Sequence, residues 1–225
     1  APALRARGVA LLDGPQLFLN WKQADPGADL FPAGGVHWST WAAWQVWREL
    51  AGLFRRQPGL ADLPDSPVRE RVWSRPLGAD ADLRNLLNLW HFEPGGPRPI
   101  AYPLVAPPPA PHQGRYAALV VGDSFALTLI DAMCRSGLFR QIDLLYYFNR
   151  RLTYPAPSFA QSRERLIAPP GIDMGPFRPA DLDWEQLLEN RQMVILVLNV
   201  IHIKAHGWGF PESLHRALTD APPPT

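Results

Sequence analysis

The sequence predicts an α/β domain built on a mostly parallel sheet. Short, nearly uninterrupted apolar runs near residues 9, 118, 145 and 197 are typical of strands buried on both faces. Segments with helical spacing of apolar residues separate these runs, and such alternation favours parallel pairing. Hydrophobic residues make up 47% of the 225 residues and charged residues 19%, so the chain can bury a substantial core.

The first part of the chain is expected to form a strand and two helices. The apolar run at 8–12 is predicted to be a strand, and Pro15 fits the first turn of the helix that follows. After a loop rich in Asp, Pro and Gly, Ser39 has the position of an N-cap, and residues 41–54 continue with helical spacing. This pattern places His37 just before a rigid helix.

The middle of the chain is rich in proline. Residues 82–90 have the pattern of a short amphipathic helix, and 93–114 are expected to run as extended polyproline II structure that packs on the surface. We therefore expect one domain over 1–220, with a proline-rich insertion at 56–115 packed on it and a flexible tail at 221–225.

The second half contains the clearest strand–helix junction. A buried strand at 116–121 runs directly into Gly122-Asp123-Ser124, and helical spacing resumes at once. Further strands are predicted at 142–148 and 193–203. A helix that follows Asp183 has the pattern of a capping box.

Composition excludes several classes of function. The formal net charge is +1 and no basic run occurs, so neither nucleic-acid binding nor a polybasic membrane anchor is expected. The single Cys134 excludes a disulfide within the chain and a zinc–cysteine cluster. No apolar run approaches the roughly 18 residues that span a bilayer, and no signal peptide is visible. His202 and His206 lack a clear third ligand, so we predict no metal and no cofactor.

Ser124 is the predicted nucleophile. Ligands of open α/β sheets bind beyond the carboxyl ends of the strands, and the free N–H groups of a helix start can stabilise an oxyanion. Gly122 permits the tight turn that exposes the Ser124 hydroxyl. The plainer interpretation is a turn with an N-capping serine, because Gly-Asp-Ser is a frequent tripeptide.

A serine nucleophile needs a base, and His37 is the strongest candidate. An unperturbed imidazole titrates near pH ~6.5, so it can accept the serine proton and return it. The other histidines are expected to be surface residues or satisfied residues of the core: His91, His112, His202, His206 and His215.

Three segments together carry a family resemblance. The segment around Gly35-Val36-His37-Trp38 resembles the DxHW block of the alginate O-acetyltransferase (AlgX/AlgJ) family of SGNH-hydrolase-like proteins, residues 82–90 (DLRNLLNLW) resemble a helix of its relatives, and 120–125 (VVGDSF) resemble its nucleophile block. The order, histidine block first and serine block later, is also that of the family. The resemblance covers most of the chain and implies a three-layer SGNH-like fold.

The resemblance implies a polysaccharide O-acetyltransferase or acetylesterase. Ser124 would carry the acetyl group, and His37 would act as general base. It further implies a periplasmic location, a polysaccharide substrate, and a membrane acyltransferase or secretion complex as partner. Relatives have a segment, including a strand, before the first strand expected here, so we expect a sheet edge or groove at that place.

Gly35 departs from the family, which has an aspartate there to orient the imidazole. Three explanations stay open. Asp29 or Asp82 supplies the acid instead, the site is a serine–histidine dyad, or the protein is a catalytically impaired glycan-binding or scaffold component of a polysaccharide export or acetylation system. A lipase-like esterase is disfavoured because the chain has no GxSxG elbow.

The remaining candidates surround these residues. Asp123 is expected to cap the helix or hold the nucleophile loop, and Asn199 to donate to the oxyanion or satisfy the backbone at a strand end. Trp38 could offer a flat face to a sugar ring or belong to the core, and Arg150 could meet an anionic sugar.

Overall fold

The computed structural model describes residues 5–6, 8–25, 27, 29–88, 99–156, 171–199 and 207–220. Within them a five-stranded mixed sheet has the order β6-β5-β4-β3-β7, and a separate two-stranded sheet pairs β1 with β2. The strands are β1 (Val68–Trp73), β2 (Ile100–Val105), β3 (Tyr116–Gly122), β4 (Phe139–Tyr146), β5 (Arg150–Pro155), β6 (Ile172–Pro176) and β7 (Met193–Val197). The helices are α2 (Gly14–Ala24), α3 (Thr40–Phe54), α4 (Asp82–Leu86), α5 (Phe125–Ser136), α7 (Trp184–Leu188) and α8 (Phe210–Asp220), with 3-10 turns η1 (Gly78–Ala81), η2 (Ala110–His112) and η3 (Pro179–Asp181).

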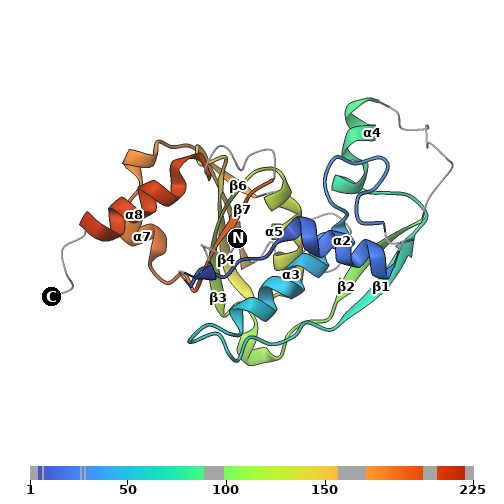
Figure 1. Ribbon diagram of the computed structural model, residues 1–225, viewed down its shortest axis with the longest axis horizontal. Helices are drawn as coiled ribbons and strands as arrows, with labels where there is room; N and C mark the ends of the chain where they lie inside the picture. Colours follow the sequence, from blue (N-terminus) through green and yellow to red (C-terminus); the bar gives the residue numbers. More distant parts are fainter. Residues whose placement is uncertain are drawn as a thin grey trace.

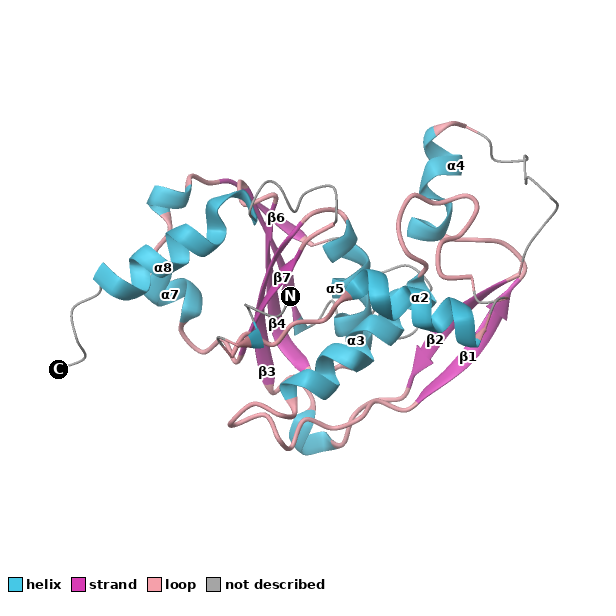
Figure 2. Cartoon of the chain, viewed as in Figure 1, coloured by secondary structure: helices cyan, strands magenta, loops and turns pink. Residues whose placement is uncertain are grey.

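Helices cover both faces of the five-stranded sheet. Figure 1 shows α3 and α5 on one side of the sheet and α7 and α8 on the other. The small β1–β2 sheet and α4 lie beyond α3, at the end of the molecule opposite α8 (Figure 2). The expected α/β class is confirmed, whereas the specific SGNH arrangement stays a prediction.

The central strand β3 divides the core in two. All seven of its residues are buried, and alternate side chains enter opposite layers. Ala118 and Val120 pack with α3 and α5, including Trp44 and Trp47. Leu119 and Val121 face the other way, in a second cluster with residues of α7 and α8. A strand buried on both faces explains the continuous apolar run in the sequence.

The sheet is parallel only around β3. This strand pairs in parallel with β4 and with β7, so the carboxyl ends of the three strands lie at the same end of the sheet. By contrast, β4–β5 and β5–β6 are antiparallel, which corrects the expectation of a mostly parallel sheet. At the other margin β7 ends the order of the described sheet, with Val194 and Leu196 exposed.

Some predicted elements are wrong. Residues 8–12 form no strand, because this segment reaches α2 as irregular chain and its apolar Leu12 packs against the core without a ladder partner. Residues 100–105, expected as polyproline II, form β2 because they have an antiparallel partner in β1. The parts of the predicted elements at 89–98 and 200–203, and the tail at 221–225, lie outside the described residues.

The predicted caps at Ser39 and Asp183 are confirmed, and Asp13 caps a further helix. Asp13 accepts from the N–H of Gln16 at the start of α2, where proline also occupies the first turn. Ser39 accepts from the N–H of Ala42 at the start of α3 (3.0 Å). Asp183 likewise accepts from the Gln186 N–H. These caps matter for function because α3 fixes the segment that carries His37.

A buried carboxylate holds the antiparallel strands to the parallel part of the sheet. Asp143 on β4 accepts hydrogen bonds from Thr153 on β5 (2.6 Å) and from Arg191 before β7 (2.5 Å), and it pairs with Arg151. Burial alone would raise the pKa of Asp143, but these donors outweigh it and lower the pKa below its ordinary value.

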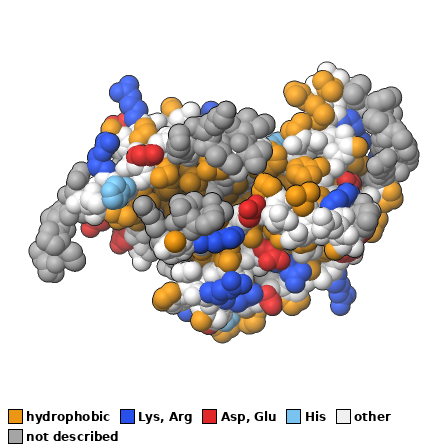
Figure 3. All heavy atoms as spheres, in the orientation of Figure 1, with side chains coloured by type: hydrophobic (Ala, Val, Ile, Leu, Met, Phe, Trp, Pro, Cys, Tyr) orange, Lys and Arg blue, Asp and Glu red, His pale blue; other side chains and the backbone are white. Residues whose placement is uncertain are grey.

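Apolar side chains also reach the surface. Figure 3 shows them gathered across the middle of one face, between the α7–α8 part and the α4 part of the molecule. In the loop before His37, Phe31 and Val36 are each more than half exposed. No helix of the described ranges is both long and apolar enough to cross a membrane.

Candidate active site

The turn between β3 and α5 leaves the Ser124 hydroxyl without a capping hydrogen bond to the helix. Ser124 occupies the N-cap of α5, but its side chain makes no capping hydrogen bond. Asp123 takes that role, since its Oδ1 accepts from the Phe125 N–H (2.9 Å). Ser124 therefore stands at the N-cap position, but its side chain does not cap the helix.

Asp123 also ties two strand ends together. It is buried, and its Oδ2 accepts from the backbone N–H of Asn199, just beyond β7 (3.2 Å). Gly122 makes this close approach feasible, because a Cβ there would lie 2.8 Å from Ala126 Cβ and 3.1 Å from Val197 Cβ. Asp123 thus holds the loop, as predicted, and places Asn199 beside it. An oxyanion role for the Asn199 side chain stays a prediction.

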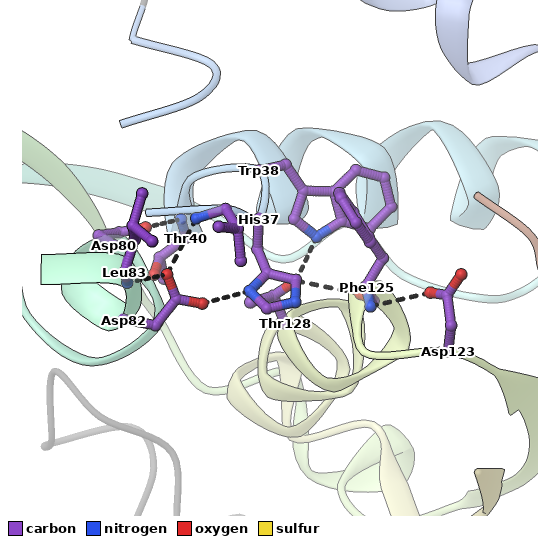
Figure 4. A network of polar contacts seen from close by, with 10 residues as sticks. His37, Trp38, Thr40, Asp80, Asp82, Leu83, Asp123, Phe125 and Thr128 are labelled. Atoms are coloured by element: carbon purple, nitrogen blue, oxygen red, sulfur yellow. Dashed lines mark hydrogen bonds and ion pairs between the residues drawn. The ribbon is translucent and has the colours of Figure 1, made fainter. Parts of the chain in front are cut away.

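His37 pairs with Asp82. Its Nδ1 lies within hydrogen-bonding distance of Asp82 Oδ2, and both side chains are mostly shielded from solvent. Figure 4 shows the imidazole between this carboxylate and the start of α5. Of the two acids that the sequence left open, Asp82 is the one that contacts the ring. Asp29 is exposed and lies outside the described contacts of His37.

The Asp82 carboxylate is itself oriented. Its second oxygen, Oδ1, accepts from the N–H of Val36 (2.9 Å) and from the N–H of Leu83 (2.7 Å). The first of these donors immediately precedes the histidine, and the second belongs to α4. The carboxylate therefore joins the histidine loop to the start of α4, and it presents its other oxygen to the ring.

Trp38 connects the loop that carries His37 to α5. Its Nε1–H donates to Thr128 Oγ1, and the Thr128 hydroxyl donates to the Phe125 carbonyl (3.0 Å). The His37 and Phe125 ring centroids are 5.0 Å apart with an edge-on geometry. Trp38 also stacks on Phe18 at 5.8 Å. This packing uses the tryptophan as part of the scaffold, and it brings His37 beside the residue that follows Ser124.

Gly34 and Gly35 let a separate segment dock against the histidine loop. A Cβ on Gly35 would lie 2.8 Å from the Ala79 carbonyl oxygen and 3.3 Å from that of Asp80. The Arg84 N–H donates to the Gly34 carbonyl (3.0 Å). Any side chain at residue 35 would push away the segment that carries Asp82. Glycine at residue 35 is therefore required by the close packing through which the segment with Asp82 reaches His37.

A second carboxylate, Asp80 of η1, is fully buried against the start of α3. Its Oδ1 accepts from the Thr40 N–H at the start of α3 (2.9 Å). Burial raises the pKa of Asp80 to about 6, an effect that the Thr40 N–H and the Tyr102 hydroxyl oppose and the charge of Asp29 reinforces.

The other predicted site residues lie elsewhere or are already paired. Arg150 is in an exposed ion pair with Asp173, and its role toward an anionic sugar stays a prediction. His112 lies in η2 and His215 in α8, both apart from the His37 contacts. His91, His202 and His206 lie outside the described residues.

Sequence reasoning missed three features of the candidate site and its surroundings. Thr128 could have been found, because it lies four residues after Ser124 and thus on the same face of α5. Asp80 carries no local signal, since its partner is 40 residues away. Tyr147 and Phe148, directly after β4, both have positive φ (48° and 54°), and the Tyr147 N–H donates to the Gly122 carbonyl (2.9 Å). Such strained backbone is typical of functional sites.

No protein-family model matches the chain, and no curated protein sequence is significantly similar to it. Within the part of the chain that the structure describes, no three or more His, Cys, Asp or Glu side chains are grouped so that they could hold a metal ion. The geometry of the described residues is thus the basis for assigning a function.

Gly35→Ala is expected to destabilise the protein by roughly 1–3 kcal/mol, since the added methyl overlaps a backbone carbonyl that cannot rotate away. Gly34→Ala is the matched control, because its Cβ would meet nothing closer than 3.6 Å. Urea unfolding of both variants measures the difference. Equal stability of the two would contradict the proposed docking joint.

The raised pKa of Asp80 predicts a pH-dependent stability. The folded state binds this proton more tightly than the unfolded state, so the favourable contribution is complete below about pH 4 and is lost as pH rises through about 6. Asp80→Asn removes the titration. Relative to wild type, its free energy of unfolding should therefore rise between pH 4 and pH 7, by on the order of 3 kcal/mol.

Urea unfolding of wild type and Asp80→Asn at both pH values tests this expectation. Asp181→Asn, which alters an exposed carboxylate of η3, serves as the control and should show no such pH-dependent gain. A stability difference between wild type and Asp80→Asn that stays constant from pH 4 to pH 7 would contradict it.

Proposed function

We propose that this protein is an acyl-transfer enzyme with a Ser124–His37–Asp82 site that moves acetyl groups on or off a polysaccharide. The observation that carries the proposal is the pairing of His37 Nδ1 with Asp82. In addition, Ser124 stands at the start of α5 with a hydroxyl that does not cap the helix. A carboxylate on Nδ1 fixes the tautomer whose Nε2 can accept a proton from a serine hydroxyl.

The proposed reaction has two steps. Ser124 Oγ attacks the acetyl carbonyl carbon while His37 Nε2 takes the hydroxyl proton, and the departing alcohol receives that proton as the ester bond breaks. An acceptor hydroxyl then attacks the acetyl-serine, its proton passing through His37, and Ser124 is released. A sugar acceptor gives transfer, and water gives hydrolysis.

The backbone N–H of Ser124 is the proposed oxyanion donor. At the first turn of α5 the Phe125 N–H donates to Asp123 Oδ1, and the Ala126 and Leu127 N–H groups donate to the carbonyls of residues 123 and 124. Among these first amides of the described helix, the Ser124 N–H is the one without a recorded acceptor. This N–H lies at the N-terminus of α5, where the helix macrodipole also favours negative charge.

The substrate class, the SGNH-like arrangement, the periplasmic location and an acyltransferase or secretion partner are supported by the sequence resemblance. The rival function, a glycan-binding scaffold that has lost activity, is supported by Gly35 and by the nine tryptophans of the chain. The position of Asp82 weakens that support, because it supplies the carboxylate that Gly35 lacks.

Substitutions in the triad should reduce turnover of 4-nitrophenyl acetate. Ser124→Ala is expected to remove nearly all activity, and His37→Ala to cost at least about 10³-fold in kcat. Asp82→Asn should cost roughly 10²–10⁴-fold, because the ring loses the partner that fixes its tautomer.

Asp29→Asn is the matched control, since it makes the same chemical change at the other acid that the sequence offered. Its kcat should stay near the wild-type value. Ser124→Ala that folds, as judged by circular dichroism, and turns over the ester at the wild-type rate would remove Ser124 from the mechanism. Wild type that binds oligosaccharide and never forms an acetyl-serine adduct, by mass spectrometry of the intact protein, would favour the scaffold function.

A further inference from the structure

Asp80 is buried at the point where the α3 start, η1 and the Asp82 segment meet. It is 0% exposed, and its Oδ1 accepts from the Thr40 N–H at 2.9 Å. Thr40 is the first residue of α3 and follows His37 by three positions. The carboxylate thus anchors the segment that carries Asp82 to the helix that fixes His37 (Figure 4).

A tyrosine from β2 supports the same joint. The Tyr102 hydroxyl accepts from the Leu77 N–H (2.7 Å) and donates to the Leu77 carbonyl (3.3 Å), and its side chain is fully buried. It therefore fixes the residue just before η1, from which Asp80 and then Asp82 follow. The backbone carbonyls of Ala79 and Asp80 also pack closely against Gly35 in the loop that carries His37.

Burying a carboxylate at this joint is costly. Burial raises the pKa of Asp80 to about 6, although the Thr40 N–H and the Tyr102 hydroxyl both favour its charged form. An apolar side chain of similar size could fill the same space without that cost, but it could not accept the Thr40 N–H. What the carboxylate provides is a fixed acceptor that joins two segments 40 residues apart.

We propose that Asp80 is a positioning residue for the Asp82–His37 pair. It acts through the Thr40 N–H, and it holds the Asp82 carboxylate in register with the imidazole. The inference rests on the proposed function, because it deepens the account of the same site. Its test, however, reads the histidine directly and needs no turnover.

The test is proton and nitrogen NMR of protein labelled with ¹⁵N-histidine. A His37 Nδ1–H that donates to a carboxylate resonates far downfield, and Asp82→Asn assigns that signal by removing it. Asp80→Ala, which leaves Thr40 without its acceptor, should shift the signal upfield or abolish it. Asp80→Asn keeps an acceptor oxygen at the same place and should retain the signal, which separates positioning from the loss of a negative charge.

Two further variants make the outcome decisive. Asp183→Ala removes another carboxylate that caps a helix, at α7, and should leave the His37 signal unchanged. Tyr102→Phe removes the hydroxyl that fixes Leu77 and should weaken the signal if Asp80→Ala fails to fold. An unchanged signal in folded Asp80→Ala, or in Tyr102→Phe where the alanine variant is unfolded, would overturn the proposal. So would loss of the signal in Asp80→Asn.

The kinetic expectation follows from the same geometry. Asp80→Ala should lower kcat by about 10- to 100-fold, as expected for a displaced catalytic group, with KM nearly unchanged, and Asp80→Asn should restore kcat. If the NMR signal responds as expected and the wild-type protein shows no ester turnover, the positioning role stands and the acyl-transfer function fails.

Discussion

The contact between His37 Nδ1 and Asp82 is the interaction on which the site depends. It joins a loop before α3 to the start of α4, and it fixes the tautomer that leaves Nε2 able to accept a proton in the proposed mechanism. The Trp38–Thr128 hydrogen bond then brings that loop against α5, at whose N-cap Ser124 lies. Without the first contact the imidazole would still pack beside Phe125, but no described hydrogen bond would fix the orientation of its ring.

The chain obtains its acid through close backbone packing. Residue 35, two residues before the histidine, is a glycine that packs closely against two carbonyls of another segment. The carboxylate consequently comes from residue 82, and Asp80 anchors its segment to α3. The glycine at residue 35 and the presence of Asp82 at the ring are two aspects of one packing arrangement.

Local sequence signals predicted the elements around Ser124 and His37 well. The apolar run of β3 and the caps at Ser39 and Asp183 are short-range features, and each was found as expected. The strand pairs β1–β2 and β5–β6 were missed, because polar or proline-containing edge strands depend on partners distant in the sequence. For the same reason the sequence could narrow the acid only to two candidates, and it gave no sign of Asp80.

The central claim is that His37 and Asp82 activate the Ser124 hydroxyl, and labelling with a fluorophosphonate tests it most directly. Such a reagent modifies a serine that an adjacent base deprotonates, with fluoride as leaving group. The account predicts one label per chain, on the peptide that contains Ser124, and far slower labelling in His37→Ala. Wild-type protein that remains unlabelled, or that is labelled equally fast without His37, would contradict it.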